Sequence, residues 1–329
     1  MISIKKIQMV DLKGQYEKIK EEVDTGIRQV IDSTAFINGP AVKEFQADFE
    51  KYLNVKHVIP CANGTDALQI AMMALGLKPG DEVITASFTY VATAEVIGLL
   101  GLTPVLVDVD PDTFNIDVAA LENNITSRTK AIVPVHLFGQ CADMEKIMAI
   151  AKKHGLYVIE DVAQAIGADY TFSDGRKMKA GTIGTIGCTS FFPSKNLGCY
   201  GDGGAMYTND DELAKKLKMI AHHGQSELYR HDVLGVNSRL DTIQAVVLKA
   251  KLRHLDSYAK ARNQVADFYD KAFANHPKLK IPTREKKSSH VFHQYTLQLT
   301  GVDRTRLREQ LAERGIPAMV YYPIPLHQQ

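Results

Sequence analysis

The sequence predicts an α/β protein with a large domain built on a mostly parallel sheet and a smaller α+β domain at its C-terminal end. The chain has 329 residues, which is too long for one small core and suits two domains. Its first half alternates short apolar runs with helical patterns, as in a sheet covered by helices on both faces. The alternation ends after Gly224. We therefore assign residues 1–245 to the large domain and residues 246–329 to the small one.

The predicted elements of the large domain follow one another regularly. Apolar runs predict strands at residues 83–86, 104–109, 131–135 and 157–160. Apolar residues at helical spacing predict helices between these strands, at residues 93–100, 118–123 and 144–153. Polar clusters follow three of the strands, at residues 87–90, 136–140 and 161–164. Ligands of such sheets collect beyond the carboxyl ends of the strands, so these clusters mark the candidate site.

A long helical stretch, residues 241–274, joins the two predicted domains and carries apolar residues at three- and four-residue spacing. A strand at residues 295–299 and a helix at residues 304–314 follow it. The chain then ends at YYPIPLHQQ without a clear closing element. We therefore expect the small domain to be incomplete.

Composition and charge exclude several classes of protein. Lys and Arg number 39 and Asp and Glu number 38, which leaves a net charge of +1 and no basic surplus for a nucleic-acid partner. The four cysteines are far apart and form no CxxC pair, which argues against a zinc site and a disulfide framework. No signal-peptide pattern opens the chain, and no apolar run approaches the roughly 20 residues that span a bilayer. We expect a soluble, cytoplasmic protein with reduced thiols and without a metal or membrane partner.

The first candidate catalytic residue is Lys195, in the block TSFFPSKN between an apolar strand and a glycine-rich stretch. Burial lowers the pKa of a lysine and frees its amine to attack a carbonyl group. The glycines indicate a backbone that approaches another group closely. By itself the pattern also fits a surface lysine in a loop, where most lysines lie. The block is not a Walker A motif, because no GxxxxGK[ST] occurs.

A second candidate group is formed by Asp161 and Gln164, just after the predicted strand at residues 157–160. A carboxylate in this place can pair with the protonated ring nitrogen of a pyridine cofactor. Gln164 adds an amide donor that suits a phenolic oxygen. Taken alone, Asp161 also fits a helix N-cap, a common role that contributes about 1 kcal/mol.

Two further blocks suit a flat, phosphorylated cofactor. The segment NGTDAL joins a strand to a helix, and the N–H groups of Gly64 and Thr65, with the Thr65 hydroxyl, suit a phosphate. A simple turn and helix cap fits this segment equally well. Tyr90 or Phe88 can supply a ring that stacks on a cofactor, although most such aromatic residues pack in cores.

Polar residues elsewhere are weaker candidates. Asn237 and Arg239 stand at the start of the long helical stretch and can reach an anionic ligand. His136, His222 and His223 can hydrogen-bond a ring or a sugar oxygen, but a single histidine is more often a structural residue.

The order of these blocks is more specific than any one of them. NGTDAL, SFTYVATA, EDVAQA, SFFPSKNLGCYGDGGA, HHGQ, GVNSRLDTIQA and YYPIPLH follow one another along the chain. This series resembles the DegT/DnrJ/EryC1/StrS family of sugar aminotransferases, which are fold-type I enzymes that use pyridoxal 5′-phosphate. The resemblance covers nearly the whole chain. Within the family, the stretch SFFPSKNLGCYGDGGAMYTNDDELA is most similar to the transaminases that act on UDP-2-acetamido-2-deoxy-3-hexulosuronic acid.

The resemblance implies a role for each candidate residue. Lys195 would hold the cofactor covalently and carry the proton between substrate and cofactor. Asp161 would pair with the pyridine nitrogen, and Gln164 would lie near the phenolic oxygen. The phosphate would be held by Gly64, Thr65, Ser190 and the partner subunit's Asn237. Tyr90, or Phe88 as the alternative, would stack on the pyridine ring. The sugar would be contacted by Arg239, Tyr321 and Tyr322. Family members are homodimers with shared active sites, so we expect a monomer to be inactive.

The implied reaction moves an amino group from L-glutamate to a nucleotide-linked keto sugar, with a UDP-linked 3-keto sugar as the first hypothesis. The product would serve the synthesis of a surface polysaccharide or lipopolysaccharide such as O-antigen. Two departures from the family pattern are present. Uronate-type enzymes can have His at the position of Tyr321, which weakens the choice of a hexuronic acid. The family's usual segment beyond YYPIPLH is also absent.

Several alternatives stay open on the sequence. The substrate can be a 4-keto sugar, and the chain can be a regulatory homologue without catalysis. A sugar dehydratase of the same fold would have His in place of the cofactor lysine, whereas Lys195 is present here. A dinucleotide-binding dehydrogenase would need a GxGxxG motif after the first strand, and none occurs there.

Overall fold

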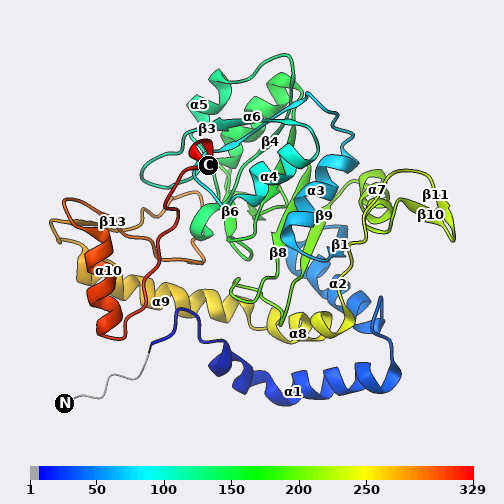
Figure 1. The fold of residues 1–329 in the computed structure, drawn as a ribbon, viewed down its shortest axis with the longest axis horizontal. Coiled ribbons are helices and arrows are strands. Elements are labelled where there is room, and N and C mark those ends of the chain that lie inside the picture. Colours follow the sequence, from blue (N-terminus) through cyan, green and yellow to red (C-terminus); the bar gives the residue numbers. More distant parts are fainter. Residues whose placement is uncertain (1–6) are drawn as a thin grey trace.

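A seven-stranded sheet forms the centre of the computed structural model, which describes residues 7–329 (Figure 1). Residues 1–6 open the segment that we examined for a signal peptide, and they lie outside the described part of the chain. The strands, in their order across the sheet, are β1 (His57–Cys61), β9 (Gly204–Thr208), β8 (Ile186–Ser190), β5 (Tyr157–Asp161), β4 (Thr129–Val133), β2 (Glu82–Ala86) and β3 (Thr103–Val107). Only β9 runs against its neighbours in this sheet. The predicted mostly parallel sheet is confirmed.

Helices cover both faces of this sheet, as the alternating pattern predicted. The predicted helices of the large domain correspond to α4 (Ala92–Leu99), α5 (Val118–Asn123) and α6 (Met144–His154). The remaining helices of this part are α1 (Leu12–Ser33), α2 (Pro40–Leu53), α3 (Gly64–Ala74) and α7 (Asp211–Ala221). The four predicted strands agree with β2, β3, β4 and β5 to within two residues at each end.

The core consists of two hydrophobic layers, one on each side of the sheet. Successive residues of a strand point to opposite faces, and β2 shows this directly. Val83 packs with α3 and α4 in one layer, whereas Ile84 packs with α2 and α6 in the other. Strands β1, β9, β5, β4 and β2 contribute to both layers in this way, which explains why their residues are apolar without strict alternation.

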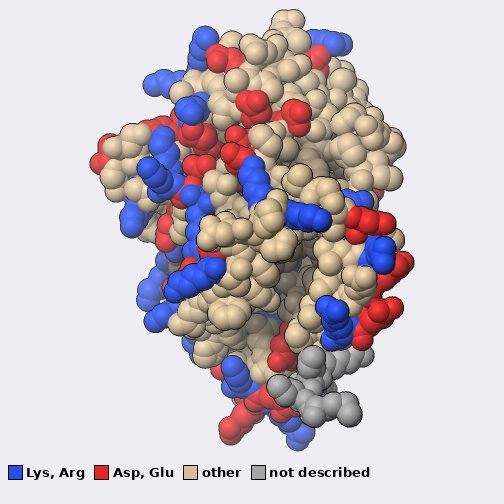
Figure 2. Space-filling model, turned by 90° about the vertical axis from the view of Figure 1, so that its left-hand side faces the viewer, with Lys and Arg blue, Asp and Glu red and all other residues tan. Residues whose placement is uncertain are grey.

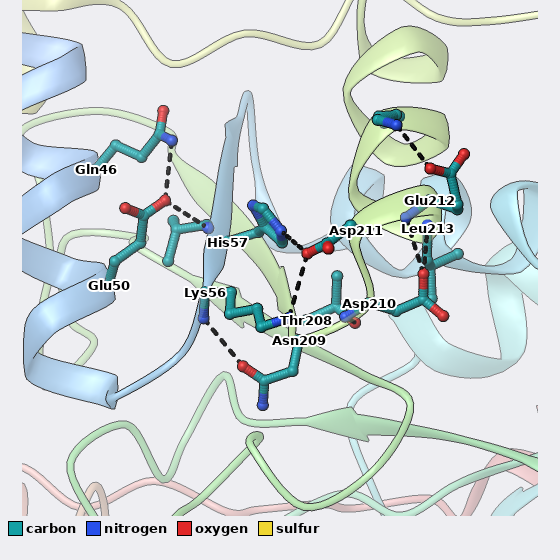
Figure 3. A network of polar contacts seen from close by, with 12 residues as sticks. Gln46, Glu50, Lys56, His57, Thr208, Asn209, Asp210, Asp211, Glu212 and Leu213 are labelled. Carbon is teal, nitrogen blue, oxygen red and sulfur yellow. Dashed lines mark hydrogen bonds and ion pairs between the residues drawn. The ribbon is translucent and has the colours of Figure 1, made fainter.

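A polar network fixes the edge strand β1 between α2 and α7 (Figure 3). Glu50 of α2 accepts hydrogen bonds from Gln46 Nε2 and from the Val58 N–H, each at 3.0 Å. His57 Nε2 contacts Asp211 Oδ1 at 2.8 Å at the start of α7. These contacts anchor the strand that leads into the Gly64 block.

The predicted long helix is wrong in one respect, because the structure divides it into α8 (Thr242–Leu252) and α9 (Leu255–Phe273). Helix α8 is buried on several sides between α1 and α2, whereas α9 buries only Leu255 and Ala266 (Figure 1). The break at residues 253–254 keeps Leu252 and Leu255 in one core layer while α9 leaves the core. The apolar spacing continues through the break, so it could not reveal the change of direction.

The predicted strand at residues 295–299 is also too long. Only β13 (Gln298–Leu299) pairs, with β12 (Leu279–Lys280), because the partner segment offers two residues. The side chain of Tyr295 instead donates from its hydroxyl to Asp270 Oδ1 at 2.7 Å. Helix α10 (Arg304–Glu313) confirms the last predicted helix. The division into domains at residue 245 stays a prediction.

Two further short hairpins are β6 (Asp169–Thr171) with β7 (Lys177–Lys179) and β10 (Gln225–Glu227) with β11 (Arg230–His231). The β10–β11 hairpin projects from the body of the molecule beyond α7 (Figure 1). None of the helices within residues 7–329 is both long and apolar enough to cross a membrane. On the face shown in Figure 2, acidic and basic side chains are interspersed, in line with the balanced charge of the sequence.

Candidate active site

The carboxyl ends of the parallel strands bring the predicted blocks to one edge of the sheet. Strand β5 ends at Asp161, β8 ends at Ser190, and β1 leads through Asn63 into Gly64. Lys195 lies in the loop between β8 and β9. Blocks separated by about 100 residues in the sequence therefore meet at one place, where ligands of such sheets bind.

Lys195 is half-buried in this loop, and its surroundings favour the free amine. Burial lowers the pKa of the Lys195 ammonium, and the negative charge of Asp161 partly opposes that effect. The Lys195 N–H donates to the Phe192 carbonyl at 2.8 Å, which makes the loop a tight turn. A lysine with a lowered pKa is the nucleophile that covalent attachment to an aldehyde needs.

The loop of Lys195 is also held from behind by two side chains of α8. Gln244 Oε1 accepts from the Tyr200 N–H at 2.8 Å. Lys251 Nζ donates to the Gly198 carbonyl at 2.7 Å and lies 4.6 Å from the centre of the Tyr200 ring. The loop that carries the Lys195 amine is therefore held in place by α8.

Asp161 is buried, and few groups neutralise its charge. Its Oδ1 accepts from the Ala163 N–H at 3.0 Å, and its Oδ2 accepts from the Thr93 hydroxyl at 3.2 Å. Burial raises the pKa of the Asp161 carboxyl, while the Ala163 N–H, the Lys195 ammonium and the Thr93 hydroxyl act in the opposite direction. A buried carboxylate in this state would be stabilised by a cation, such as the protonated ring nitrogen of a pyridine.

Gly64 and Ser190 lie against each other. A Cβ atom on Gly64 would lie 2.6 Å from Ser190 Cβ, so only glycine fits. Gly64 is the first residue of α3, and Asn63 caps this helix by accepting from the Asp66 N–H at 2.8 Å. Ser190 Oγ accepts from the Phe192 N–H at 3.2 Å, which leaves its hydrogen for another acceptor. The start of α3, with Thr65, and this hydroxyl form a donor set that fits a phosphate.

Gln164 is buried and held in a defined orientation. Its Oε1 accepts from the Phe138 N–H at 2.8 Å, so its Nε2 is the donor that reaches the Tyr322 hydroxyl at 3.0 Å. The C-terminal segment returns to the sheet edge, because the Leu326 N–H donates to the Ser87 carbonyl at 2.8 Å. This path brings Tyr322 beside Gln164, and its contact with the substrate stays a prediction.

An aromatic cluster surrounds Tyr322. Phe88 stacks on Phe114 with ring centres 5.7 Å apart and meets Tyr322 edge to face, also at 5.7 Å. Tyr321 packs half-buried against the same cluster. Tyr90, in contrast, is 59% exposed. Phe88 is thus engaged with other rings, which favours Tyr90 for the predicted stacking on a cofactor.

Asn237 and Arg239 flank Ser238, whose Oγ accepts from the Ala62 N–H at 3.0 Å just before the Gly64 block, at the base of the loop that carries the β10–β11 hairpin. Asn237 is exposed and pairs with His222 through a β-bridge. Burial and then the charge of Arg239 lower the pKa of His222. The His223 carbonyl accepts from His231 Nδ1 at 2.9 Å. These contacts shape the hairpin loop, and the role of Asn237 for the partner subunit stays a prediction.

His136 has a structural role rather than the ligand contact we considered. It is fully buried, its Nε2 donates to Glu160 at 2.9 Å, and its Nδ1 accepts from the Ala142 N–H at 3.1 Å. Glu160 also accepts from three backbone N–H groups, those of Gly181, Ile183 and Gly184. The adjacent acids of β5 therefore have separate tasks, since Glu160 fixes the turn before β8 and Asp161 faces the site.

Sequence reasoning missed three residues close to this group. Thr93 bonds Asp161 as described, Asn196 follows Lys195, and His293 lies near enough for the Lys195 charge to lower its pKa. The block EDVAQA pointed to β5, but no local pattern marks His293, because its neighbourhood to Lys195 arises only in three dimensions. A separate cavity of about 620 Å³ lies between α5 and α6, lined by residues such as Asn115, Tyr170 and Ser288. It does not include the Lys195 group.

The family profile described as the DegT/DnrJ/EryC1/StrS aminotransferase family matches residues 17–329. The chain belongs to this family. Its membership confirms the predicted fold-type I architecture, the aminotransferase activity and the cofactor, pyridoxal 5′-phosphate.

Three curated relatives match this family member over 98% of its length. UDP-2-acetamido-2-deoxy-3-oxo-D-glucuronate aminotransferase of Pseudomonas aeruginosa is 49% identical, and 88% of its own length is covered. A protein of Geobacillus stearothermophilus named pleiotropic regulatory protein is 50% identical, with 86% covered. UDP-N-acetyl-3-dehydro-alpha-D-glucosamine 3-aminotransferase of Acidithiobacillus ferrooxidans is 47% identical, with 85% covered.

A solved structure also resembles the chain over nearly its whole length. The crystal structure of NtdA from Bacillus subtilis with the bound cofactor PMP is 33% identical and gives a TM-score of 0.90. The match covers 99% of this chain and 74% of NtdA. The aminated form of the cofactor is thus held by a chain of this fold.

Proposed function

We propose that this aminotransferase moves the amino group of L-glutamate to the 3-keto group of a UDP-linked sugar, as a cytoplasmic homodimer that serves surface polysaccharide or O-antigen synthesis. The observation that carries the proposal is that the end of β5 with Asp161, the end of β8 with Ser190 and the Lys195 loop meet at one edge of the sheet, where Asp161 and Lys195 affect each other's pKa. Two relatives that share nearly half of this sequence carry names that specify UDP-linked 3-oxo or 3-dehydro sugars.

The residues divide the work as follows. Bound pyridoxal 5′-phosphate supplies an electron sink that stabilises negative charge on the reacting carbon. Lys195 Nζ takes the α-proton from glutamate and, in the second half of the reaction, returns a proton to the sugar carbon. Asp161 keeps the ring nitrogen of the cofactor protonated. Gly64, Thr65 and Ser190 hold the phosphate, so that Lys195 acts on one face of a fixed ring.

The sugar-binding side consists of Tyr321, Tyr322 and Arg239, with Arg239 acting together with a partner subunit. The Tyr322 hydroxyl accepts from Gln164 Nε2, and Tyr321 packs beside Tyr322 in the aromatic cluster. Neither of these tyrosines supplies a positive charge for a sugar carboxylate. The positive charge on this side comes from Arg239, so the substrate panel includes both an uncharged N-acetylated keto sugar and a uronic acid.

The exposed β10–β11 hairpin and its flank support the proposed homodimer. Leu228, Tyr229 and Leu234 are 78%, 86% and 89% exposed. Large apolar side chains gathered on a projecting hairpin are typical of an interface. A partner subunit that packs there would bring its own Asn237 and Arg239 toward this chain's cofactor site, or receive them in return.

The test is an assay of the purified chain with glutamate, pyridoxal 5′-phosphate and a panel of UDP- and dTDP-linked 3- and 4-keto sugars. We expect mass spectrometry to find an amino sugar only from UDP-linked 3-keto substrates, and 2-oxoglutarate to form in equal amount. Turnover confined to a 4-keto sugar would exclude the proposed position of the amino group. Lys195→Ala serves as the control without the amine.

A regulatory protein without catalysis is the second candidate, because one relative at 50% identity carries a regulatory name. The two functions differ in an observable way. Sodium borohydride should fix the cofactor to Lys195 in an enzyme, as a mass increase on the peptide that contains it. A colourless protein with an unmodified Lys195 peptide would favour the regulatory function.

A further inference from the structure

Thr93, in the first turn of α4, is a buried polar residue outside the set that we assign to the cofactor and the sugar. Its side chain is 1% exposed, and its hydroxyl donates to Asp161 Oδ2 at 3.2 Å. The hydroxyl is the donor, because an ionised carboxylate can only accept. A threonine in a helix often gives its hydrogen to a carbonyl of the preceding turn. Thr93 instead gives it to the end of β5, so it links α4 to the candidate site.

The Asp161 carboxylate is held through both of its oxygens. Oδ1 accepts from the nearby Ala163 N–H at 3.0 Å, whereas Thr93 reaches Oδ2 from 68 residues earlier in the chain. The backbone of Asp161 is fixed as well, because its N–H donates to the Pro134 carbonyl and its carbonyl accepts from the His136 N–H, each at 3.0 Å. With this backbone fixed, Asp161 moves mainly by rotation of its side chain, and the Thr93 contact opposes that rotation.

The same contact affects where a proton shared with Asp161 would lie. A hydrogen bond donated to a carboxylate favours its charged form. Burial raises the pKa of the Asp161 carboxyl, and the Thr93 hydroxyl is among the groups that oppose this rise. When a carboxyl group faces a pyridine nitrogen, the proton between them stays on the group with the greater affinity for it. A donor on the carboxylate lowers the affinity of that side, so the Thr93 contact favours a protonated ring nitrogen.

We propose that Thr93 is a positioning residue for Asp161, whose hydroxyl holds the carboxylate in the ionised form and the orientation that keep the ring nitrogen of the cofactor protonated. The inference rests on the proposed function and deepens it, because it concerns the same Asp161 site. The proton on the ring nitrogen is what makes bound pyridoxal 5′-phosphate an electron sink. Thr93 acts through Asp161 rather than on the reacting atoms.

The experiment compares two ligands that differ only at the ring nitrogen. Pyridoxamine 5′-phosphate and its 1-deaza analogue, which has a C–H group in place of that nitrogen, are titrated into the full chain by isothermal titration calorimetry. Neither ligand carries the aldehyde that attaches to Lys195, so both dissociation constants report non-covalent binding. The ratio of the two constants measures the preference of the site for the ring nitrogen.

We expect Thr93→Val to reduce this preference by about tenfold relative to the native chain, because one hydrogen bond to a charged group is lost. Thr93→Ser retains the hydroxyl and should restore most of the preference. Thr85→Val is the matched control, because Thr85 is also buried but its hydroxyl donates to the Val133 carbonyl at 2.9 Å. A general loosening of the fold changes both dissociation constants alike and leaves their ratio unaltered.

Asp161→Asn shows whether Thr93 acts through the carboxylate. This variant should lose most of the preference, and Thr93→Val added to it should change the ratio no further, because both substitutions act on one interaction. A further fall in the double variant would mean that Thr93 acts by another route and would reject the inference.

An unchanged ratio in Thr93→Val, or an equal fall in Thr85→Val, would overturn the positioning role. If Thr93→Val does not fold, Thr93→Ala removes the same hydroxyl, and the same outcomes decide. A native chain that binds both ligands equally well would show that Asp161 does not pair with the ring nitrogen, and the inference would fail with that pairing. These titrations contain no sugar, so the keto-sugar assay alone decides the proposed substrate.

Discussion

Lys251 of α8 is a buried lysine, with 1% of its surface exposed, and one carbonyl group and one aromatic ring hold its ammonium. Burial lowers the pKa of Lys251 to about 8. Unfolded chains titrate lysine near pH 10.4. Between these values the unfolded chain binds more protons at this residue than the folded chain does, so stability rises with pH across this window.

We predict that the free energy of unfolding of the native chain gains up to about 3 kcal/mol from Lys251 between pH 8 and pH 10.4. Lys251→Met should lack this gain, because no proton is released there. Urea unfolding at pH 7.5 and 9.5 measures the difference between the two proteins. Lys260→Met, which changes an exposed lysine of α9, is the control and should follow the native chain. Parallel pH curves for Lys251→Met and the native chain would contradict this prediction.

At the residue scale, the sequence predicted Lys195, Asp161 and Gln164 as one group, since each stands in a block of recognisable order. It could not predict Lys251 or His293. Lysines and histidines are common on surfaces, and only the packing of α8 and of the segment after α9 places these two beside the Lys195 loop. Their roles depend on neighbours far away in the sequence.

At the scale of elements, we expect the start of helix α3 to be highly sensitive to a small substitution, both in stability and in cofactor binding. A Cβ on Gly64 would lie 2.6 Å from Ser190 Cβ, closer than two carbon atoms can approach without displacement. We predict that Gly64→Ala destabilises the chain by about 1–3 kcal/mol through overpacking. It should also weaken binding of pyridoxal 5′-phosphate by roughly tenfold or more, because the phosphate donors move apart.

Thermal unfolding and absorbance titration with the cofactor measure both effects. Gly98→Ala is the matched control, because Gly98 lies in helix α4 and no atom lies within 4 Å of the position of its added Cβ. There alanine should be neutral or stabilise by up to about 1 kcal/mol. Unaltered cofactor affinity in Gly64→Ala would show that the start of α3 does not hold the phosphate.

The elements of the parallel sheet were predictable because βα alternation leaves a strong pattern, as β2, α4 and β5 show. Two features of the elements could not be predicted from the sequence. The break between α8 and α9 interrupts the helix without interrupting its apolar spacing, and β13 depends on the length of its partner β12. Both are set by tertiary packing, which a local pattern does not contain.

At the scale of the whole molecule, the β10–β11 hairpin should decide whether two chains associate. We predict that the double variant Tyr229→Asp and Leu234→Asp is monomeric in sedimentation velocity and loses turnover by at least about tenfold, because charge on an apolar interface opposes association. Val265→Asp, on the exposed side of α9, is the control for added surface charge. A dimeric, active double variant would place the interface elsewhere.

The order of the strands across the sheet was beyond the sequence. Strand β1 comes first in the chain, but in the sheet it lies at one edge and pairs with β9, which comes much later in the chain. Strand β9 runs antiparallel to both β1 and β8. The loop that joins β8 to β9 and carries Lys195 reverses the direction of the chain. The reversal is the reason that the Gly64 block, the Ser190 block and Lys195 meet.

The two neighbouring acids of β5 have one further consequence. Side chains of a strand alternate between faces, so shifting β5 by a single position would exchange Glu160 and Asp161. Glu160 would then no longer accept hydrogen bonds from His136 and from the three N–H groups of the turn at residues 181–184. The ring nitrogen of the cofactor would face the wrong carboxylate. An insertion or deletion within β5 itself is therefore incompatible with catalysis, whereas one in the loops that flank this strand leaves its register unchanged.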